Sequence, residues 1–400
     1  MLALDVVPSV QYSDPWRISL PDRLRLLVAG RRRIAYFYEQ PNNSTFRYRA
    51  YNMAQVLNAN GRDTSASYFF ATDLHRLGEI ADLADILVIC RTRYDNRVNQ
   101  LVAAFRHRRK RVLFDIDDLV FDTEYVHLLL STLDLNIEEQ CVWDDWFSYI
   151  SRVGASLKQC DGAITTNDYL ADKIQCFAGI PVSVVPNFLN REQLDISDRI
   201  YAVKQSEKPR DDGLIHIGYF SGSPSHNRDF AIAAPALEAL LEEDPQIGVV
   251  VVGFIEIGDA LERFGPRVKR VAFQDFVNLQ RVIGSVEFNI MPLQVNAFTN
   301  CKSELKYFEA AIVGTLSIAS PGYTYAKAIR HGDNGYISQA HQWEKTIKDA
   351  VSGMKDYQAM AARSHDDARV KYAWFNQRNL ILSALGLERA SISEPHLAGS

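Results

Sequence analysis

The segment LIHIGYFSGSPSHNRDF (214–230) joins a run of apolar residues to a polar turn and then to the start of a helix. Gly222 lets the backbone approach a ligand, and Ser223 with its neighbours can cap the next helix, whose N-terminal amides favour an anion. His226 and Arg228 add side-chain donors at the same place. The segment predicts a parallel α/β unit with an anion site at the end of its strand; a capped turn with solvated side chains is the alternative.

The alternation of apolar runs and helical stretches continues on both sides of this segment. Between Leu189 and Gly213 it stops, and the polar, charged composition predicts a linker. We expect an α/β fold in which two Rossmann-like parallel-sheet domains face a cleft. Further strands are predicted at 33–40, 84–90, 110–117, 162–168, 182–187, 247–254, 267–273, 286–293 and 315–320. The predicted parts are an N-terminal appendage (1–32), a first domain (33–205), a second domain (206–375), and a C-terminal helix and tail (376–400).

The composition limits the possible partners and compartments. Of the 400 residues, 49 are acidic and 44 basic, so the formal charge of -5 provides no general attraction for nucleic acid. The five cysteines are odd in number and form no C-x-x-C pair, which predicts reduced thiols rather than disulfides or a zinc site. No secretory signal and no run of 18 apolar residues is found, so we expect a cytoplasmic protein.

A second motif, NCKSELKYFEAAIVGTLSIAS (300–320), carries two lysines and a glutamate before a small-residue stretch and a buried strand. On a helix, Lys302, Lys306 and Glu309 are spaced i, i+4 and i+7 and share one face. Two ammonium groups with a carboxylate one turn further suit a diphosphate next to a ribose diol. The alternative is a solvated, salt-bridged stripe.

These motifs, with HGDNGYI (331–337), resemble the donor domain of retaining glycosyltransferases of the GT-B architecture, close to glycosyltransferase family 4. The likeness spans residues 33–375 and is strongest over 214–337. It implies transfer of a sugar from a nucleoside diphosphate sugar to a hydroxyl of a glycan or glycolipid. The reaction would retain the anomeric configuration and serve cell-surface polysaccharide or glycoconjugate synthesis, as a hexosyltransferase of class EC 2.4.

The resemblance also assigns roles to single residues of this chain. Glu309 matches the glutamate that holds the ribose hydroxyls, His226 and Arg228 stand where the family binds the pyrophosphate, and Lys302 or Lys306 supplies a second cation. The full set of donor-binding residues expected is Gly222, Ser223, His226, Arg228, Lys302, Ser303, Lys306 and Glu309.

Two departures from the family pattern concern the sugar and the acceptor. The family has another glutamate eight residues before the ribose one, and Cys301 stands there in this chain, so Glu304, Lys302 or the backbone would contact the sugar. The first strand–helix loop lacks the usual glycines and carries Arg47, Tyr48 and Arg49 in their place. Fixed cations and an aromatic face suit a sugar or phosphate-bearing acceptor; a polar loop with Tyr48 packed on the core is the alternative.

The acidic segment DIDDLVFD (115–122) follows a predicted strand at the cleft and has three interpretations. In a glycosyltransferase, Asp117 or Asp118 orients the acceptor hydroxyl or stabilises positive charge on the sugar. In a haloacid-dehalogenase-type phosphatase, Asp115 is the nucleophile and Asp117 the acid/base, with magnesium between them. Structurally, the aspartates cap a helix and pair with an arginine in the sheet.

The basic run RHRRKR (106–111) lies at the end of a predicted helix. It suggests reversible docking to an anionic membrane surface at the inner face, which flotation with and without anionic lipid would test. A solvated helix end that complements its dipole and a nucleic-acid contact are the alternatives.

Lysines, arginines and a helix N-terminus would neutralise the donor diphosphate, so we expect neither a metal nor another cofactor. Three further functions remain open: a nucleotide-sugar epimerase of the same architecture, the phosphatase that uses Asp115, and a non-catalytic nucleotide-sugar-binding protein suggested by Cys301.

Overall fold

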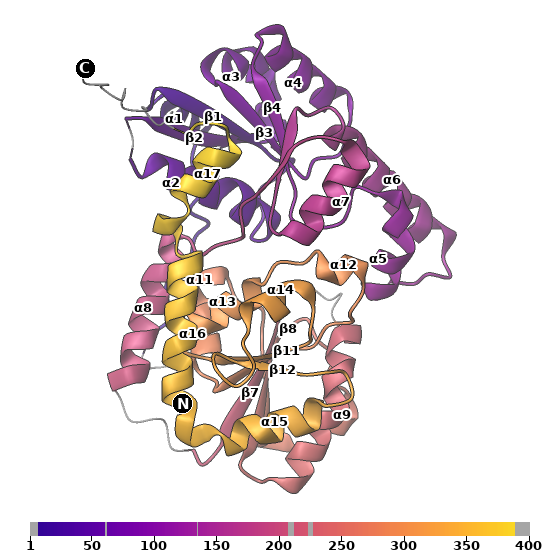
Figure 1. Ribbon diagram of the computed structural model, residues 1–400, viewed down its shortest axis with the longest axis vertical. Coiled ribbons are helices and arrows are strands. Elements are labelled where there is room, and N and C mark those ends of the chain that lie inside the picture. The colour runs from indigo at the N-terminus through magenta and orange to yellow at the C-terminus, as the bar shows by residue number, and fades with distance from the viewer. Residues whose placement is uncertain (1–6, 61, 134, 207–211, 223–226, 389–400) are drawn as a thin grey trace, which may run out of the picture.

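The computed structural model describes residues 7–60, 62–133, 135–206, 212–222 and 227–388. It contains two six-stranded sheets in which all paired strands are parallel, each with helices packed around it (Figure 1). Strands such as IGVVVVG are buried on both faces, which explains their continuous apolar composition. The GT-B-like arrangement of two α/β domains expected from the sequence is confirmed.

The first sheet has the order β2-β1-β3-β4-β5-β6. Its strands are β1 (Arg32–Phe37), β2 (Thr64–Phe69), β3 (Ile86–Cys90), β4 (Arg111–Asp115), β5 (Gly162–Thr165) and β6 (Val182–Val184). Its helices are α1 (Leu20–Leu27), the π-helical η1 (Arg47–Tyr51), α2 (Asn52–Asn58), η2 (Ala71–Arg76), α3 (Leu77–Leu83), α4 (Asn96–His107), η3 (Thr123–Tyr125), α5 (Val126–Thr132), α6 (Gln140–Leu157) and α7 (Asp168–Ala178).

The second sheet has the order β12-β11-β10-β7-β8-β9. Its strands are β7 (Ile215–Ser221), β8 (Ile247–Gly253), β9 (Val268–Val271), β10 (Phe288–Met291), β11 (Leu316–Ala319) and β12 (Tyr336–Ile337). Its helices are α9 (Asn227–Glu243), α10 (Gly258–Glu262), η5 (Gly265–Arg267), α11 (Phe276–Gly284), α12 (Ala297–Asn300), α13 (Leu305–Ala311), α14 (Tyr323–Ala328), α15 (Trp343–Ser352), η6 (Met354–Asp356) and α16 (Tyr357–Tyr372). No helix in these described ranges is long and apolar enough to cross a bilayer.

The segment predicted as a linker contains a regular helix, α8 (Arg191–Ser206), which packs against α11. The sequence pattern did not indicate this helix, because two polar residues, Gln193 and Ser197, lie on its buried face. Ser197 accepts a hydrogen bond from Gln280 of α11. Buried polar groups that are hydrogen-bonded cost little, but they erase the apolar periodicity that marks a helix.

Strand β2, which the sequence analysis missed, has a similar cause. Thr64 and Ser65 are buried and donate to the carbonyls of Leu57 and Leu27. Their hydroxyls make TSASYF polar in composition although the whole strand is buried.

The N-terminal segment is no appendage in its described part. Val10 exchanges two backbone hydrogen bonds with the Asn278 side chain of the second domain. Trp16 is buried, packs edge-on against Phe46 of the first domain and stacks on Phe276 of the second. The segment therefore fills the junction between the domains.

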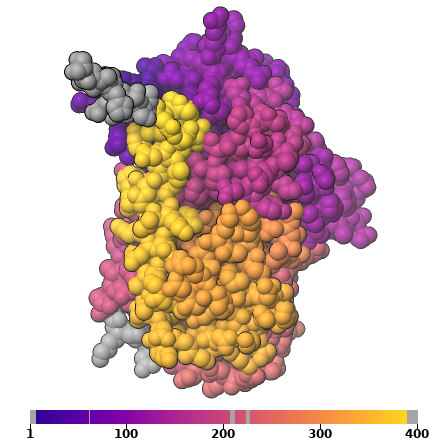
Figure 2. All heavy atoms as spheres, in the orientation of Figure 1, coloured from indigo at the N-terminus to yellow at the C-terminus, as the bar shows by residue number. Residues whose placement is uncertain are grey.

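The chain crosses between the domains again near its end. The backbone N–H of Leu189, on the way out of the first domain, donates to the carbonyl of Tyr372, and Leu189 forms a bridge with Ala373. After the turn η7 (Trp374–Asn376), α17 (Arg378–Ala384) packs against α2 and β6. In Figure 2 these C-terminal residues (yellow) run along one side of the molecule over both domains.

A buried ion pair fixes η1 to the first sheet. Arg49 makes two bonds to the carboxylate of Asp115 at the end of β4, at 2.6 and 3.1 Å, and neither side chain is exposed. The Arg49 guanidinium also donates to the carbonyl of Val185 and the side chain of Asn187, beyond β6. One guanidinium thus joins three segments of the first domain.

We expect Arg49→Met to lower the free energy of unfolding of the first domain by about 3–5 kcal/mol, because it leaves the Asp115 carboxylate buried and unpaired. Chemical denaturation measures this change. Arg263→Met, which removes an exposed ion-paired arginine, should change the free energy of unfolding much less. An equal loss of unfolding free energy in the two variants would show that the buried ion pair matters no more for stability than an exposed one.

Candidate functional site

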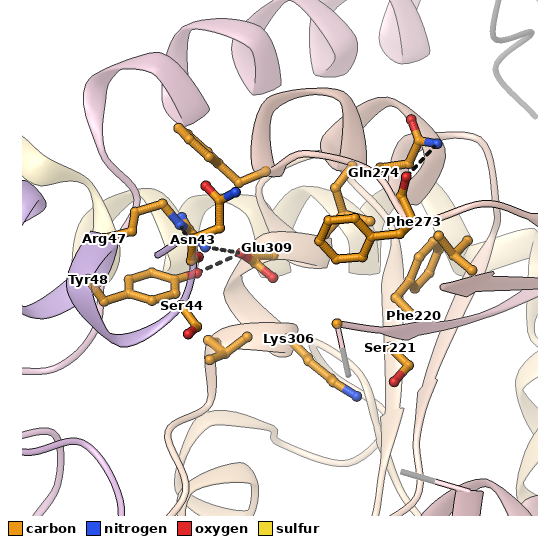
Figure 3. Close-up of a pocket in the computed structure, with 15 residues that line it drawn as sticks. Asn43, Ser44, Arg47, Tyr48, Phe220, Ser221, Phe273, Gln274, Lys306 and Glu309 are labelled. Atoms are coloured by element: carbon orange, nitrogen blue, oxygen red, sulfur yellow. Dashed lines mark hydrogen bonds and ion pairs between the residues drawn. The ribbon is translucent and has the colours of Figure 1, made fainter. Parts of the chain in front are cut away.

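A cavity of about 360 Å³ lies between the domains, at the carboxyl ends of β7 and β8. The strand order reverses between β7 and β10, and ligands of open parallel sheets bind at such a switch point. Figure 3 shows the lining side chains. The lining residues are Asn43, Ser44, Arg47, Tyr48, Phe220, Ser221, Gly222, Val252, Phe273, Gln274, Phe276, Leu279, Leu305, Lys306 and Glu309.

Glu309 lies on α13 and is buried at the wall of this cavity. Its Oε1 atom accepts hydrogen bonds from the Tyr48 hydroxyl at 2.6 Å and from the Gln193 amide at 2.9 Å. The Arg47 guanidinium lies 3.7 Å from the same oxygen. The sequence analysis missed Gln193, because it lies 116 positions from Glu309 in the segment predicted as a linker.

Lys306 lines the cavity on the same helix, with its Nζ 5.0 Å from the ring centre of Tyr219. Burial lowers the pKa of the Lys306 ammonium to about 8, against the opposing effect of Asp229. Lys302 precedes the helix, so the prediction that Lys302, Lys306 and Glu309 share one helical face is wrong. Lys302 lies in the turn after α12, and its side chain points toward the first domain, where the Lys302 Nζ lies 3.7 Å from the carboxylate of Asp118.

The remaining predicted donor residues differ in their placement. Gly222 lines the cavity, and a Cβ added there would meet no atom of the described residues within 4 Å. Ser223 and His226 lie outside the described residues. Arg228, at the start of α9, donates to the carbonyl of Ser131 in the first domain. Ser303 is buried, and its hydroxyl has no hydrogen-bond partner in the described part of the chain.

The loop after β1 supplies the opposite wall. Arg47 and Tyr48 line the cavity, with the Arg47 guanidinium 4.0 Å from the Tyr48 ring centre and 4.6 Å from that of Phe276. Arg49 points the other way into its own sheet and is fully buried against Asp115. The prediction that Arg49 contacts an acceptor is therefore wrong, since a ligand cannot reach it.

Asp117 and Asp118 lie beyond the end of β4, and Asp117 bonds to Thr45, which follows the cavity residue Ser44 in the chain. Asp117 accepts from the Thr45 hydroxyl at 3.0 Å and from Arg91 at 3.4 Å. Arg91 also lies 4.0 Å from Asp118, which faces Lys302. Arg91 has a positive φ of 35°, which is unusual for a residue with a side chain and typical of functional sites. The sequence analysis did not find Thr45 or Arg91.

Solved structures with this arrangement of two sheets are found over nearly the whole chain. HepE of Anabaena in complex with UDP has a TM-score of 0.59 at 13% identity, covering 88% of this chain and 99% of that chain. The chain has the GT-B fold. WaaG, a glycosyltransferase involved in lipopolysaccharide biosynthesis, gives 0.56 at 13% identity, covering 88% and 100%. Sucrose-phosphate synthase of Thermosynechococcus elongatus gives 0.58 at 13%, covering 89% and 98%.

Comparison by sequence alone finds no matching family model and no matching curated protein. At these identities the structures establish the GT-B fold and not the reaction. The roles of single residues therefore depend on their geometry in this chain.

The geometry removes one alternative function. A phosphatase of the haloacid-dehalogenase type needs an accessible aspartate nucleophile, and Asp115 is fully buried in its ion pair with Arg49. The phosphatase interpretation is therefore wrong. The third interpretation of the acidic segment, an Asp–Arg pair in the sheet, is confirmed for Asp115.

Glu304 does not take the place of the glutamate that Cys301 replaces. It lies away from the GT-B cleft cavity, accepts a hydrogen bond from Tyr372 and lines a separate cavity of about 210 Å³. Burial raises the pKa of the Glu304 carboxyl. The Cys301 thiol is itself fully buried and donates to the carbonyl of Ala297.

The basic run 106–111 bonds largely to its own domain. Arg106, Arg108, Lys110 and Arg111 each donate to a backbone carbonyl, and Arg108 also pairs with Asp82. The membrane contact of this run stays a prediction. Among the described residues no three metal-ligating side chains gather, and the expectation that no metal is needed also stays a prediction.

We expect two lysine side chains to titrate near pH 8, because burial also lowers the pKa of Lys204 to about 8. Nuclear magnetic resonance of ¹³C-labelled lysines measures both, and Lys306→Met or Lys204→Met removes one signal each. A nucleoside diphosphate in the cavity should raise the pKa of Lys306 and leave that of Lys204 unchanged. Titration of every lysine above pH 10 would contradict the buried placement.

Proposed function

We propose that the protein is a glycosyltransferase that moves a sugar from a nucleoside diphosphate sugar to a hydroxyl of a glycan or glycolipid. The observation that carries this proposal is the cavity at the switch point of the second sheet, where one carboxylate, one ammonium and an aromatic wall meet. The UDP and UDP-glucose complexes of HepE, which has the same fold, support it.

Each part of the donor has a matching group in the cavity. The free oxygen of Glu309 would accept hydrogen bonds from the ribose diol, and the Lys306 ammonium would pair with the diphosphate. The base would lie against Phe273 and Phe276. The sequence resemblance would add Ser223 and His226, which lie outside the described residues, to the groups that bind the diphosphate. With these cations and the amides that begin α9, the diphosphate would need no metal.

The sugar would extend from the diphosphate toward Lys302 and the buried hydroxyl of Ser303, since the Cys301 thiol is inaccessible. There it would meet Asp117. The bond between the anomeric carbon and the diphosphate oxygen breaks, the acceptor oxygen bonds to that carbon, and its proton leaves with the diphosphate. The Asp117 carboxylate would stabilise positive charge on the sugar or orient the acceptor hydroxyl, with retention of configuration.

The acceptor would enter from the first domain, on the side of Asp117 and Arg91. A polysaccharide or glycoconjugate at the cell surface is the product class we propose, because WaaG, of the same fold, is involved in lipopolysaccharide biosynthesis. Contact with the membrane through the 106–111 run would then bring the enzyme to a lipid-linked acceptor. Catalysis is preferred to the non-catalytic alternative because Asp117, Arg91, Asp118 and Lys302 form a linked group of charges from both domains.

A thermal-shift panel of nucleoside diphosphates and their sugars tests the donor site, because a ligand that binds the folded state raises the melting temperature. Glu309→Gln should weaken the best ligand by about 10- to 100-fold, as expected for loss of hydrogen bonds to a charged group. Glu304→Gln, at the N-terminal end of the same helix but outside the cavity, should leave the shift unchanged. The donor site would be disproved by a wild-type protein that no nucleotide stabilises.

Asp117→Asn should lower kcat by about 100- to 1,000-fold and leave nucleotide affinity unchanged, because the carboxylate acts on charge that develops in the transition state. Release of nucleoside diphosphate from the donor, with a glycan panel or water as acceptor, measures the rate. Asp122→Asn is the matched control, since Asp122 only caps η3 in the same loop. Equal rates for Asp117→Asn and the wild type would remove Asp117 from the mechanism.

A further inference from the structure

We infer that Tyr48 of the first domain and Gln193 of α8 are positioning residues that hold Glu309 for a ribose diol, so that contacts from η1 and α8 determine the preference for ribonucleotides. This inference depends on the proposed donor site and adds to it the two contacts that orient Glu309. The second domain carries the nucleotide cavity, but the groups that orient its key carboxylate come from η1 and α8.

The two oxygens of Glu309 have different surroundings. Oε1 accepts the hydrogen bonds of Tyr48 and Gln193 and faces Arg47. Oε2 accepts no hydrogen bond from the described residues, and Figure 3 shows it turned from Tyr48 toward the side of Lys306. A carboxylate held by one oxygen keeps the other in a fixed direction, and two adjacent ribose hydroxyls can donate to it.

Both donors are themselves held in place. The Tyr48 ring packs against the Arg47 guanidinium, which lies between it and Phe276. Burial raises the pKa of the Tyr48 hydroxyl, so it remains a donor at neutral pH. Arg47 donates to the Gln193 side-chain oxygen at 3.1 Å, which turns the amide nitrogen of Gln193 toward Glu309.

The backbone of η1 gives independent support. The segment 47–51 is a π-helix, a rare conformation that is found mostly at functional sites. Consecutive residues of this π-helix point in different directions. Tyr48 faces the cavity and bonds to Glu309, whereas Arg49 faces the first sheet and bonds to Asp115. Just before it, Thr45 bonds to Asp117, so one short segment contacts both the ribose carboxylate and the proposed reaction centre.

Calorimetric titration tests the inference with UDP, GDP and ADP, and then with the 2′,3′-dideoxy form of whichever binds. Tyr48→Phe should weaken the ribonucleotide about tenfold and leave the dideoxy form unchanged, since that form has no diol for Glu309 to accept from. Gln193→Met should act in the same direction and replaces Tyr48→Phe if that variant does not fold.

Tyr51→Phe is the matched control. Tyr51 lies on η1, as Tyr48 does, and its hydroxyl donates to Glu192 at 2.7 Å. Glu192 precedes Gln193 on α8, and neither Tyr51 nor Glu192 lines the cavity. Tyr51→Phe should leave both affinities unchanged. Equal weakening of the ribo and dideoxy forms by Tyr48→Phe, or the same loss in Tyr51→Phe, overturns the inference alone. If no nucleotide binds the wild type, the proposed function fails and the inference with it.

Discussion

The bonds between Arg49 and Asp115 are the constraint on which the rest of the site depends. They fix η1 against the end of β4, and η1 then presents Arg47 and Tyr48 across the cleft to Glu309. A buried charge pair contributes little net stability compared with apolar packing, but it allows one arrangement of the backbone and penalises others. In this protein, the cost of separating Arg49 from Asp115 keeps η1 in place and so maintains the geometry of the proposed site around Glu309.

The sequence predicted the features that depend on local pattern. Apolar runs located ten of the twelve strands, and the spacing of Lys306 and Glu309 placed both in one cavity. It failed where tertiary contacts replace pattern: α8 and β2 bury polar residues, and Gln193 meets Glu309 from a distant helix. The sequence shows the charge of Arg49 but not its pairing with the buried Asp115, and for this reason Arg49 is wrongly predicted to contact an acceptor.

The net charge of the chain also differs from the local charge in the cleft. A formal charge of -5 excludes a general positive field, but it leaves room for positive charge placed locally. The cleft gathers Arg47, Arg91, Lys302 and Lys306 with Glu309, Asp117 and Asp118, and most of these charges are partly neutralised by one another across the domain boundary. An anionic ligand would rearrange this network of pairs rather than fill an open positive pocket.

In the described part of the chain, the connections at Leu189 and Ala373 lie against each other through a single parallel β-bridge. Because both connections lie at this one place, a hinge between the domains would lie close to it. Tyr48 and Glu309 lie on opposite walls of the cleft, and any rotation that widens it lengthens their 2.6 Å bond. Under the proposed function, opening of the cleft would therefore release Glu309 from Tyr48 and weaken the binding of the ribose.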